Sequence, residues 1–383
     1  MNKINDKFGV DFTFISSKEI EENRLTGSLA IFTADILDEI ANQNLSDRFI
    51  LIINSIARPL IRARFPDFEV CEMGGWLTRL TNSLFRKQMI YRLRKYGVYN
   101  HALKKKGISK VWFPYMIPEN VNHINVDYVG TCHDLMQLEG KQEAYRQMFL
   151  NAKDTVVISG FVKQQIMDIL DIAGERIDVI PNAISLGTRA QQKTKPIPEL
   201  VHKKYLLDVN GYSERKNTLT MIAAFNRIRD AIDYDLVLCG GYVEGDYYQS
   251  CVSLIERLRL SDRVHMFVRI PDEERNWLFQ NCEMCITPSE NEGFGRTPIE
   301  AAVCLKPVIS TRATSLEEVT CGLVHYYDDP RDDEALANLI LEVIAHPDSP
   351  QRLRMIRDTY VARYAPSTVI GEYMDMFERS FSK

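Results

Sequence analysis

Short apolar runs alternate with longer segments of helical periodicity along almost the whole chain. The short runs are rich in β-branched and aromatic residues, as buried strands are. They predict strands at 11–15, 49–53, 111–113, 126–131, 155–158 and 178–180, and again at 205–209, 235–238, 264–267, 284–287, 307–310 and 323–326. Strands that alternate with helices are typical of parallel sheets covered by helices on both faces. The pattern therefore predicts an α/β protein built of doubly wound parallel sheets.

A polar segment with two prolines, at 191–199, separates the two sets of strands and is interpreted as a linker. A chain of 383 residues is also long for a single hydrophobic core. We therefore predict two Rossmann-like domains, at 1–195 and 203–365, that face each other across a cleft. A final helical segment at 366–383 follows the second domain, and we expect it to pack back on the first. Ligands of such sheets bind at the carboxyl ends of the strands.

The segment 288–300 follows the predicted strand at 284–287 and combines glycines with acidic residues. Gly293 and Gly295 flank Phe294, which allows backbone N–H groups to approach a ligand closely. Glu292 and Glu300 are eight positions apart and offer carboxylates for hydroxyl groups. An anion site beside two carboxylates suits a phosphate attached to a polyol, as in a sugar nucleotide.

The same segment also has a purely structural interpretation. Thr297, Pro298 and Glu300 are the N-cap, first and third helical residues of a predicted capping box. That capping box alone accounts for Glu300, and the glycines alone fit an ordinary turn after a buried strand.

Arg215 and Lys216 stand between the strand at 205–209 and an amphipathic helix for which Asn217 is the predicted cap. The planar guanidinium of arginine and the compact ammonium of lysine together suit a diphosphate. The alternative is a solvated basic pair on a loop.

Two further candidates lie in the first half of the chain. His133 and Asp134 follow the strand at 126–131, where they are placed to contact a substrate, although Asp134 is equally suited to cap the next helix. Gly27, between Thr26 and Ser28, precedes a helical pattern and could face a phosphate.

The composition argues against a nucleic-acid-binding protein, a membrane-spanning protein and a metalloprotein. A net charge of −5 argues against general binding of nucleic acid. No secretory signal pattern opens the chain and no apolar run reaches the length of a bilayer span, so we expect a cytoplasmic location. Cys282 and Cys285 have a CxxC spacing without a second such pair or a nearby histidine, so we expect no metal site.

Basic and apolar residues interleave at 85–106, which contains eight lysines and arginines. This pattern suits an amphipathic helix that contacts anionic lipid at the inner face of a membrane. The alternative is a helix that packs on the core and exposes its basic face to solvent.

Taken together, these motifs resemble the family 4 glycosyltransferases, and the matches occur in the family's order from about 24 to 310. The matching residues are Gly27, His133 and Asp134, 180–182, Gly211, Arg215 to Asn217, 238–241, Pro288 and Ser289, 292–295 and Glu300. The resemblance implies a GT-B fold of two Rossmann-like domains, and a retaining hexosyltransferase that uses a nucleotide sugar without a metal.

The resemblance also implies roles for individual residues. The catalytic group would be His133, Glu292, Arg215 and Lys216, with Glu292 orienting the donor sugar and the two cations neutralising its diphosphate. Donor binding would involve Arg215, Lys216, Gly293, Phe294, Gly295, Arg296, Thr297, Glu300 and Gly27, with Glu300 holding the ribose hydroxyls. No cofactor would be bound permanently.

The resemblance implies a nucleotide sugar as one partner, with GDP-mannose favoured and a UDP-sugar as the alternative. The acceptor would be a glycan or a lipid-linked oligosaccharide in the synthesis of a cell-surface polysaccharide. Three positions depart from the family pattern: Arg296 replaces a usual leucine, Arg269 a frequent glycine, and the loop at Gly27 lacks a second glycine. The rival interpretations are another GT-B enzyme, such as a sugar-nucleotide epimerase, and a binding subunit without catalysis.

Overall fold

The computed structural model describes residues 7–23, 25, 28–73, 97–135, 138–184 and 193–381. Its chain divides into two compact units, Met1–Ile184 with Pro366–Lys383, and Ser185–Ala365. The boundary at 184/185 lies within the predicted first domain of 1–195, and the final helical segment belongs to the first unit. Each unit contains one sheet, and every strand pairing within these sheets is parallel.

The first unit has a seven-stranded sheet in the order β3-β2-β1-β4-β5-β6-β7. Its strands are β1 (Phe8–Asp11), β2 (Phe49–Asn54), β3 (Glu69–Met73), β4 (Lys110–Phe113), β5 (Asp127–Cys132), β6 (Asp154–Val157) and β7 (Ile177–Val179). Its helices are α1 (Ser17–Glu21), α2 (Ser28–Asn42), α3 (Arg58–Arg64), α5 (Val98–Lys105), α6 (Pro118–Val121), α7 (Gln142–Asn151), α8 (Gly160–Leu170) and α17 (Pro366–Phe381), with 3-10 turns η1 (Ser46–Arg48), η2 (Ser55–Ala57) and η4 (Gly174–Arg176).

The second unit has a six-stranded sheet in the order β10-β9-β8-β11-β12-β13. Its strands are β8 (Tyr205–Val209), β9 (Asp235–Gly240), β10 (Val264–Val268), β11 (Met284–Thr287), β12 (Val308–Thr311) and β13 (His325–Tyr327). Its helices are α10 (Thr218–Ile228), α11 (Gly245–Arg257), α12 (Asp272–Asn281), α13 (Arg296–Val303), α14 (Leu316–Val319), α15 (Asp333–Ala345) and α16 (Pro350–Tyr364), with 3-10 turns η5 (Pro198–Leu200) and η6 (Glu214–Lys216). The predicted fold class, two Rossmann-like parallel-sheet units, is confirmed.

The first predicted strand and one omitted strand differ from the prediction. The strand predicted at 11–15 begins three residues earlier as β1 and ends at Asp11, whose carboxylate accepts hydrogen bonds from Thr13 and Tyr99. The strand β3 was not predicted. It contains Glu69 and Glu72 besides apolar residues, and among the described strands it pairs with β2 alone. Charged side chains on such an edge strand discourage pairing with another chain.

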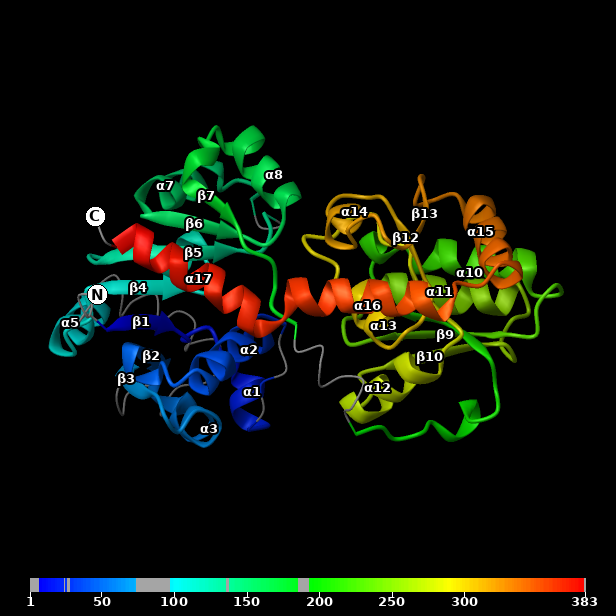
Figure 1. Ribbon diagram of the computed structural model, residues 1–383, viewed down its shortest axis with the longest axis horizontal. Coiled ribbons are helices and arrows are strands. Elements are labelled where there is room, and N and C mark those ends of the chain that lie inside the picture. Colours follow the sequence, from blue (N-terminus) through cyan, green and yellow to red (C-terminus); the bar gives the residue numbers. More distant parts are fainter. Residues whose placement is uncertain are drawn as a thin grey trace. The chain divides into compact units, whose positions relative to one another are not determined.

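Helix α17 completes the core of the first unit, where Figure 1 shows it crossing the strands. Its buried residues include Val369, Ile370, Tyr373, Met376 and Phe377, and these pack in one core with side chains of β1, β2 and α2. Their spacing follows one face of a helix, so burying that face stabilises both α17 and the sheet below it.

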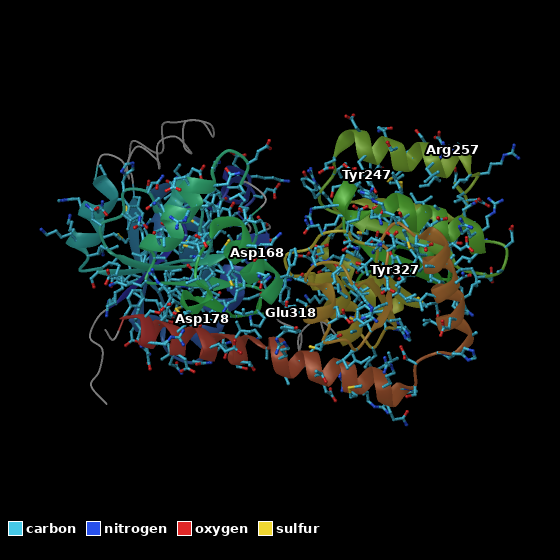
Figure 2. All side chains as sticks on the ribbon, turned by 90° about the horizontal axis from the view of Figure 1, so that it is seen from above. Asp168, Asp178, Tyr247, Arg257, Glu318 and Tyr327 are labelled. Atoms are coloured by element: carbon cyan, nitrogen blue, oxygen red, sulfur yellow. The ribbon has the colours of Figure 1, made fainter. Side chains whose placement is uncertain are left out.

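The core of the second unit is formed by apolar residues of β8, β9 and β11 with those of α10, α11 and α15. Tyr327 of β13 belongs to this core and Tyr247 of α11 packs against it; both are labelled in Figure 2. Helix starts follow their capping residues: Asp332 accepts a hydrogen bond from the Ala335 N–H, and Ser349 accepts one from Arg352 before Pro350 opens α16. These helices hold the sheet whose carboxyl edge carries the candidate site.

Candidate functional site

The candidate site lies at the carboxyl ends of β8 and β11, where the strand order of the second unit reverses. The chain leaves β8 toward β9 on one side, whereas β11 and β12 follow on the other side. Such a topological switch point leaves space for a ligand in open α/β sheets. The two loops that follow these strands, 210–217 and 288–295, contain most of the predicted site residues.

Arg215 and Lys216 lie on the short 3-10 turn η6, which Asn217 ends in the left-handed conformation with a φ of +58°. Asn217 is the N-cap residue of α10, as predicted, but its side chain makes no capping hydrogen bond to the helix backbone. Its amide instead donates to the carbonyls of Pro288, at 3.1 Å, and Pro330. The Glu290 N–H donates to the Arg215 carbonyl at 2.8 Å. Asparagine tolerates this backbone conformation, so Asn217 both turns the chain and fastens the cationic turn to two other loops.

The carboxylate of Glu292 binds both cations. Arg215 Nη1 lies 3.3 Å from Glu292 Oε2, and Lys216 Nζ donates to Glu292 Oε1. Arg215 Nη1 also donates to the Asn291 carbonyl at 3.0 Å. The Lys216 and Glu292 side chains are 13% and 10% exposed, whereas Arg215 is 35% exposed. The structure therefore brings together three of the predicted catalytic residues in one partly buried cluster.

The glycine loop is held in place by its neighbours after β12. The Glu292 N–H donates to Thr314 Oγ1 at 3.0 Å, and the Glu292 carbonyl accepts from Thr314 Oγ1 and Ser315 Oγ. Phe294 is buried and packs edge-on against Tyr364, with ring centroids 5.5 Å apart. The phenylalanine thus anchors the loop through its side chain while its backbone remains at the site.

Gly295 requires its small size and its backbone conformation. Its φ is +87°, and an added Cβ would lie 2.5 Å from Leu316 Cδ2. Because of the left-handed backbone and this close approach, any side chain at position 295 would be energetically costly. Gly295 is also the N-cap residue of α13.

The predicted capping box at Thr297 and Glu300 is wrong. Helix α13 begins at Arg296, and no side-chain cap precedes it because Gly295 occupies the N-cap position. The Thr297 hydroxyl donates to the Val209 carbonyl at the end of β8, at 3.0 Å. Glu300 is 7% exposed and its carboxylate lies 3.4 Å from Arg296 Nε, one turn earlier. The capping alternative therefore does not explain Glu300, and Arg296 is a cation paired with it at the helix start.

Arg269 follows β10 and contacts the loop after β9. Its backbone is left-handed, with a φ of +55°, and its N–H donates to the Gly240 carbonyl at 3.0 Å. The guanidinium Nε donates to the Gly241 carbonyl at 3.1 Å. The arginine is thus fixed at the same edge of the sheet as the cationic turn.

Asp208 is a buried carboxyl group that the sequence analysis missed. It lies in β8 and is 2% exposed, and its Oδ1 accepts a hydrogen bond from the Asn210 amide. Burial raises the pKa of Asp208 to about 7, although that hydrogen bond and the charge of Lys216 oppose the effect. An acidic residue within an apolar strand was the available signal, because a buried carboxyl needs a reason to be there.

His133 and Asp134 lie in the first unit, after β5. The buried His133 ring has its Nε2 2.9 Å from the Pro114 carbonyl and meets Phe32 edge-on at 4.8 Å. A carbonyl only accepts, so Nε2 carries the hydrogen. Burial lowers the pKa of His133, which favours the neutral ring. Asp134 caps no described helix, since the next one, α7, begins after Lys141.

Two predictions fall wholly or partly outside the described residues. Gly27 is one of them. Residues 85–96 of the basic segment are another, and only its end, in and beside α5, is described. There Tyr99 and Leu103 are buried in the first unit, while Lys104, Lys105 and Lys106 are exposed. That end is therefore a core-facing helix with a basic outer face. Among the described helices, none is both long enough and apolar enough to cross a bilayer.

Part of the chain is similar to known glycosyltransferases. Residues 190–360 match the family model described as "Glycosyl transferases group 1". The chain is 29% identical over 213 residues to the O-antigen chain mannosyltransferase RfbU of Salmonella typhimurium, which covers 55% of this chain and 56% of that protein. It is 26% identical over 247 residues to the O-antigen chain mannosyltransferase B of Escherichia coli, covering 60% and 62%. The aligned parts thus span little more than half of these two relatives.

Solved structures resemble the chain over nearly its full length. A glycosyltransferase from Rickettsia africae has a TM-score of 0.72 at 17% identity, covering 99% of this chain and 100% of that one. The Anabaena protein HepE, in complex with UDP and glucose, has the same TM-score and identity, covering 98% and 100%. These structures confirm the GT-B fold. The family model and the relatives bear out the predicted resemblance to mannosyltransferase-like glycosyltransferases of family 4.

Proposed function

We propose that this chain, in which residues 190–360 form a group 1 glycosyltransferase domain within a GT-B fold, transfers a hexose from a nucleotide sugar to a glycan or lipid-linked acceptor. The observation that carries the proposal is the cluster of Arg215, Lys216 and Glu292 beside the glycine loop and the start of α13. Two cations, a helix N-terminus and a carboxylate are the groups that a sugar diphosphate needs.

The chemistry follows from where charge develops. When the bond between sugar and phosphate breaks, negative charge grows on the departing diphosphate. Arg215, Lys216 and the N–H groups at the start of α13 would stabilise that charge, and each such group contributes about 3 kcal/mol in comparable sites. Protein cations would then do the work of a metal ion. His133 and Glu292 are proposed to contact the transferred sugar, with Glu292 orienting it.

We further propose a retaining transfer in which the donor phosphate helps to remove the proton of the acceptor hydroxyl. In this proposal Glu292 orients the sugar through its hydroxyls and does not attack it as a glycosidase nucleophile would. Glu300, buried one turn into α13, is proposed to hold the ribose hydroxyls, and the backbone of 293–297 the donor phosphates and sugar.

The donor and acceptor are proposed from the relatives. Two of them are named O-antigen chain mannosyltransferases, which favours GDP-mannose as the donor and a cell-surface polysaccharide as the product. HepE binds UDP in its crystal, which keeps UDP-sugars in the test panel. The basic segment at 85–106 is proposed to attract anionic lipid headgroups near a lipid-linked acceptor.

Transfer assays with GDP-, UDP-, ADP- and dTDP-sugars test the proposal. We expect Arg215→Ala and Glu292→Ala each to lower kcat/KM at least on the order of a hundredfold with the best donor. Arg331→Ala, which removes an arginine paired with Glu290 on a neighbouring loop, is the control and should retain activity. Undiminished transfer in both site variants would remove the assignment. Release of free nucleotide only when donor and acceptor are both present separates a transferase from a binding subunit.

A further inference from the structure

The Glu292 carboxylate forms ion pairs with Arg215 and Lys216, the same two cations that we propose bind the donor diphosphate. One oxygen accepts from Arg215, at 3.3 Å, and the other accepts from Lys216. The Glu292 carboxylate is nearly buried, so water does little to weaken these two contacts. In this arrangement the cations are already neutralised in part, and the carboxylate has no oxygen that is not bonded to a cation.

The backbone around this cluster is fixed independently of the carboxylate. Thr314 and Ser315 hold the Glu292 main chain, and the Asn291 carbonyl accepts a second hydrogen bond from Arg215. The Glu290 N–H binds the Arg215 carbonyl, so the two loops stay joined without the ion pairs. These contacts do not involve the Glu292 carboxylate, so they would continue to join the two loops if it left the cations.

Resting on the proposed function, we infer that Glu292 is the counter-ion of Arg215 and Lys216 until a donor arrives, and that the donor diphosphate takes its place. A diphosphate beside an unmoved carboxylate would face a like charge at close range, which is unfavourable in a partly buried site. After the exchange, the freed carboxylate accepts a hydrogen bond from a hydroxyl of the donor sugar. Glu292 thus links binding of the diphosphate to presence of the sugar.

The exchange has a consequence for selectivity. A sugar nucleotide supplies both the phosphates that replace Glu292 and the hydroxyl that satisfies it. A nucleoside diphosphate supplies the phosphates but no sugar hydroxyl. Its binding leaves the buried Glu292 carboxylate without a hydrogen-bond partner, which costs binding free energy. The site therefore disfavours the nucleoside diphosphate product relative to the donor, and this difference favours product release.

Calorimetry with inorganic pyrophosphate, GDP and UDP tests this inference at one fixed ionic strength. Glu292→Gln keeps the shape of the side chain and removes its charge, so we expect it to bind pyrophosphate and the diphosphates about tenfold more tightly than the wild type, a gain of about 1.4 kcal/mol. The ratio of the affinity for a sugar nucleotide to the affinity for its nucleoside diphosphate, measured in the same way, should be smaller in Glu292→Gln than in the wild type. Glu292→Ala, checked for folding by its thermal transition, must also tighten pyrophosphate binding.

Glu290→Gln is the matched control, because it removes an equal charge two residues away from a side chain that binds Arg331. It should change the affinity for pyrophosphate less than about twofold, as surface charges do. Equal tightening in both glutamine variants would reduce the effect to the general field and overturn the inference. Unchanged or weaker binding of pyrophosphate by Glu292→Gln would also overturn the inference. The proposed function would still stand in that case, provided that the wild type binds nucleotides. Absence of binding to any nucleotide or sugar nucleotide in every variant would overturn both.

Discussion

At the scale of single residues, Asp208 makes the stability of the second unit depend on pH. Its folded-state pKa of about 7 lies above the ordinary value of 3.8, so the folded protein binds the proton more tightly than the unfolded chain. The stability that this group contributes is complete below about pH 4 and is lost as the pH rises through 7. Across that range the loss is on the order of 4 kcal/mol, at about 1.4 kcal/mol for each pKa unit.

Replacing Asp208 with asparagine keeps its size and removes the titration. Urea denaturation at pH 5, 6, 7 and 8 should show the wild type losing stability toward pH 8 relative to Asp208→Asn, so that the two curves diverge. Curves that stay parallel would show that Asp208 does not titrate in this range. The charged groups with the largest influence on Asp208 are Lys216 and Glu292, so Glu292→Gln at the same four pH values separates their contribution.

The sequence predicted which candidate residues lie near one another better than it predicted their hydrogen-bond and ion-pair partners. Arg215, Lys216, Glu292 and Glu300 were found from strand ends, glycines and charge, and the structure places these residues in the two loops at the switch point and at the start of α13. The pairing of Glu292 with both cations depends on contact between segments 76 residues apart, which no local pattern encodes. The side-chain partners of Asn217 were missed for the same reason, since Pro288 and Pro330 are distant from it in sequence.

At the scale of elements, the glycine loop depends on Gly295. Alanine there would meet Leu316 and would also have to adopt a φ of +87°, so we expect Gly295→Ala to destabilise the second unit by about 2 kcal/mol or more and to weaken donor binding. Gly245→Ala is the control, because an added Cβ at Gly245 has no atom within 4 Å among its described neighbours. Its stability should change by less than about 0.5 kcal/mol.

A double-mutant cycle separates the two costs at Gly295. Leu316→Ala removes the side chain that an added Cβ would strike, so the double variant should be about 1 kcal/mol more stable than the sum of the single effects. The remaining cost belongs to the left-handed backbone. Strictly additive denaturation energies would show that Leu316 does not limit the size of residue 295.

Strand and helix patterns predicted most elements because buried strands and amphipathic helices repeat over many residues. The ends were less certain, because they depend on single groups. The left-handed Gly295 is one of them, since α13 begins directly after it at Arg296, one residue before the predicted cap Thr297. The edge strand β3 was missed because its glutamates weaken the apolar signal that identifies the buried strands. Edge strands have one partner and need fewer apolar residues.

At the scale of the whole molecule, the C-terminal helix α17 packs into the core of the first unit, which is otherwise built from the N-terminal half of the chain. Tyr373 OH lies 3.0 Å from Thr131 Oγ1, which also accepts from Trp112 Nε1 at 3.1 Å. The ring of Tyr373 packs on Trp112 with centroids 5.1 Å apart, and Phe377 packs on Phe8 at 5.5 Å. A segment that is last in sequence is thus part of a polar and aromatic network within the first unit.

Removal of 366–383 should therefore unfold the first unit and spare the second. Val369, Ile370, Tyr373, Met376 and Phe377 are at most 1% exposed, and at about 2 kcal/mol for each buried side chain their loss approaches the whole stability of an ordinary domain. Limited proteolysis of the truncated chain should leave a resistant fragment within 193–365 and digest 7–184. Tyr373→Phe, which deletes only the hydroxyl bonded to Thr131, should cost about 1 kcal/mol and leave both units resistant. A truncated chain whose first unit resists digestion would show that its sheet, α2 and α3 suffice for folding.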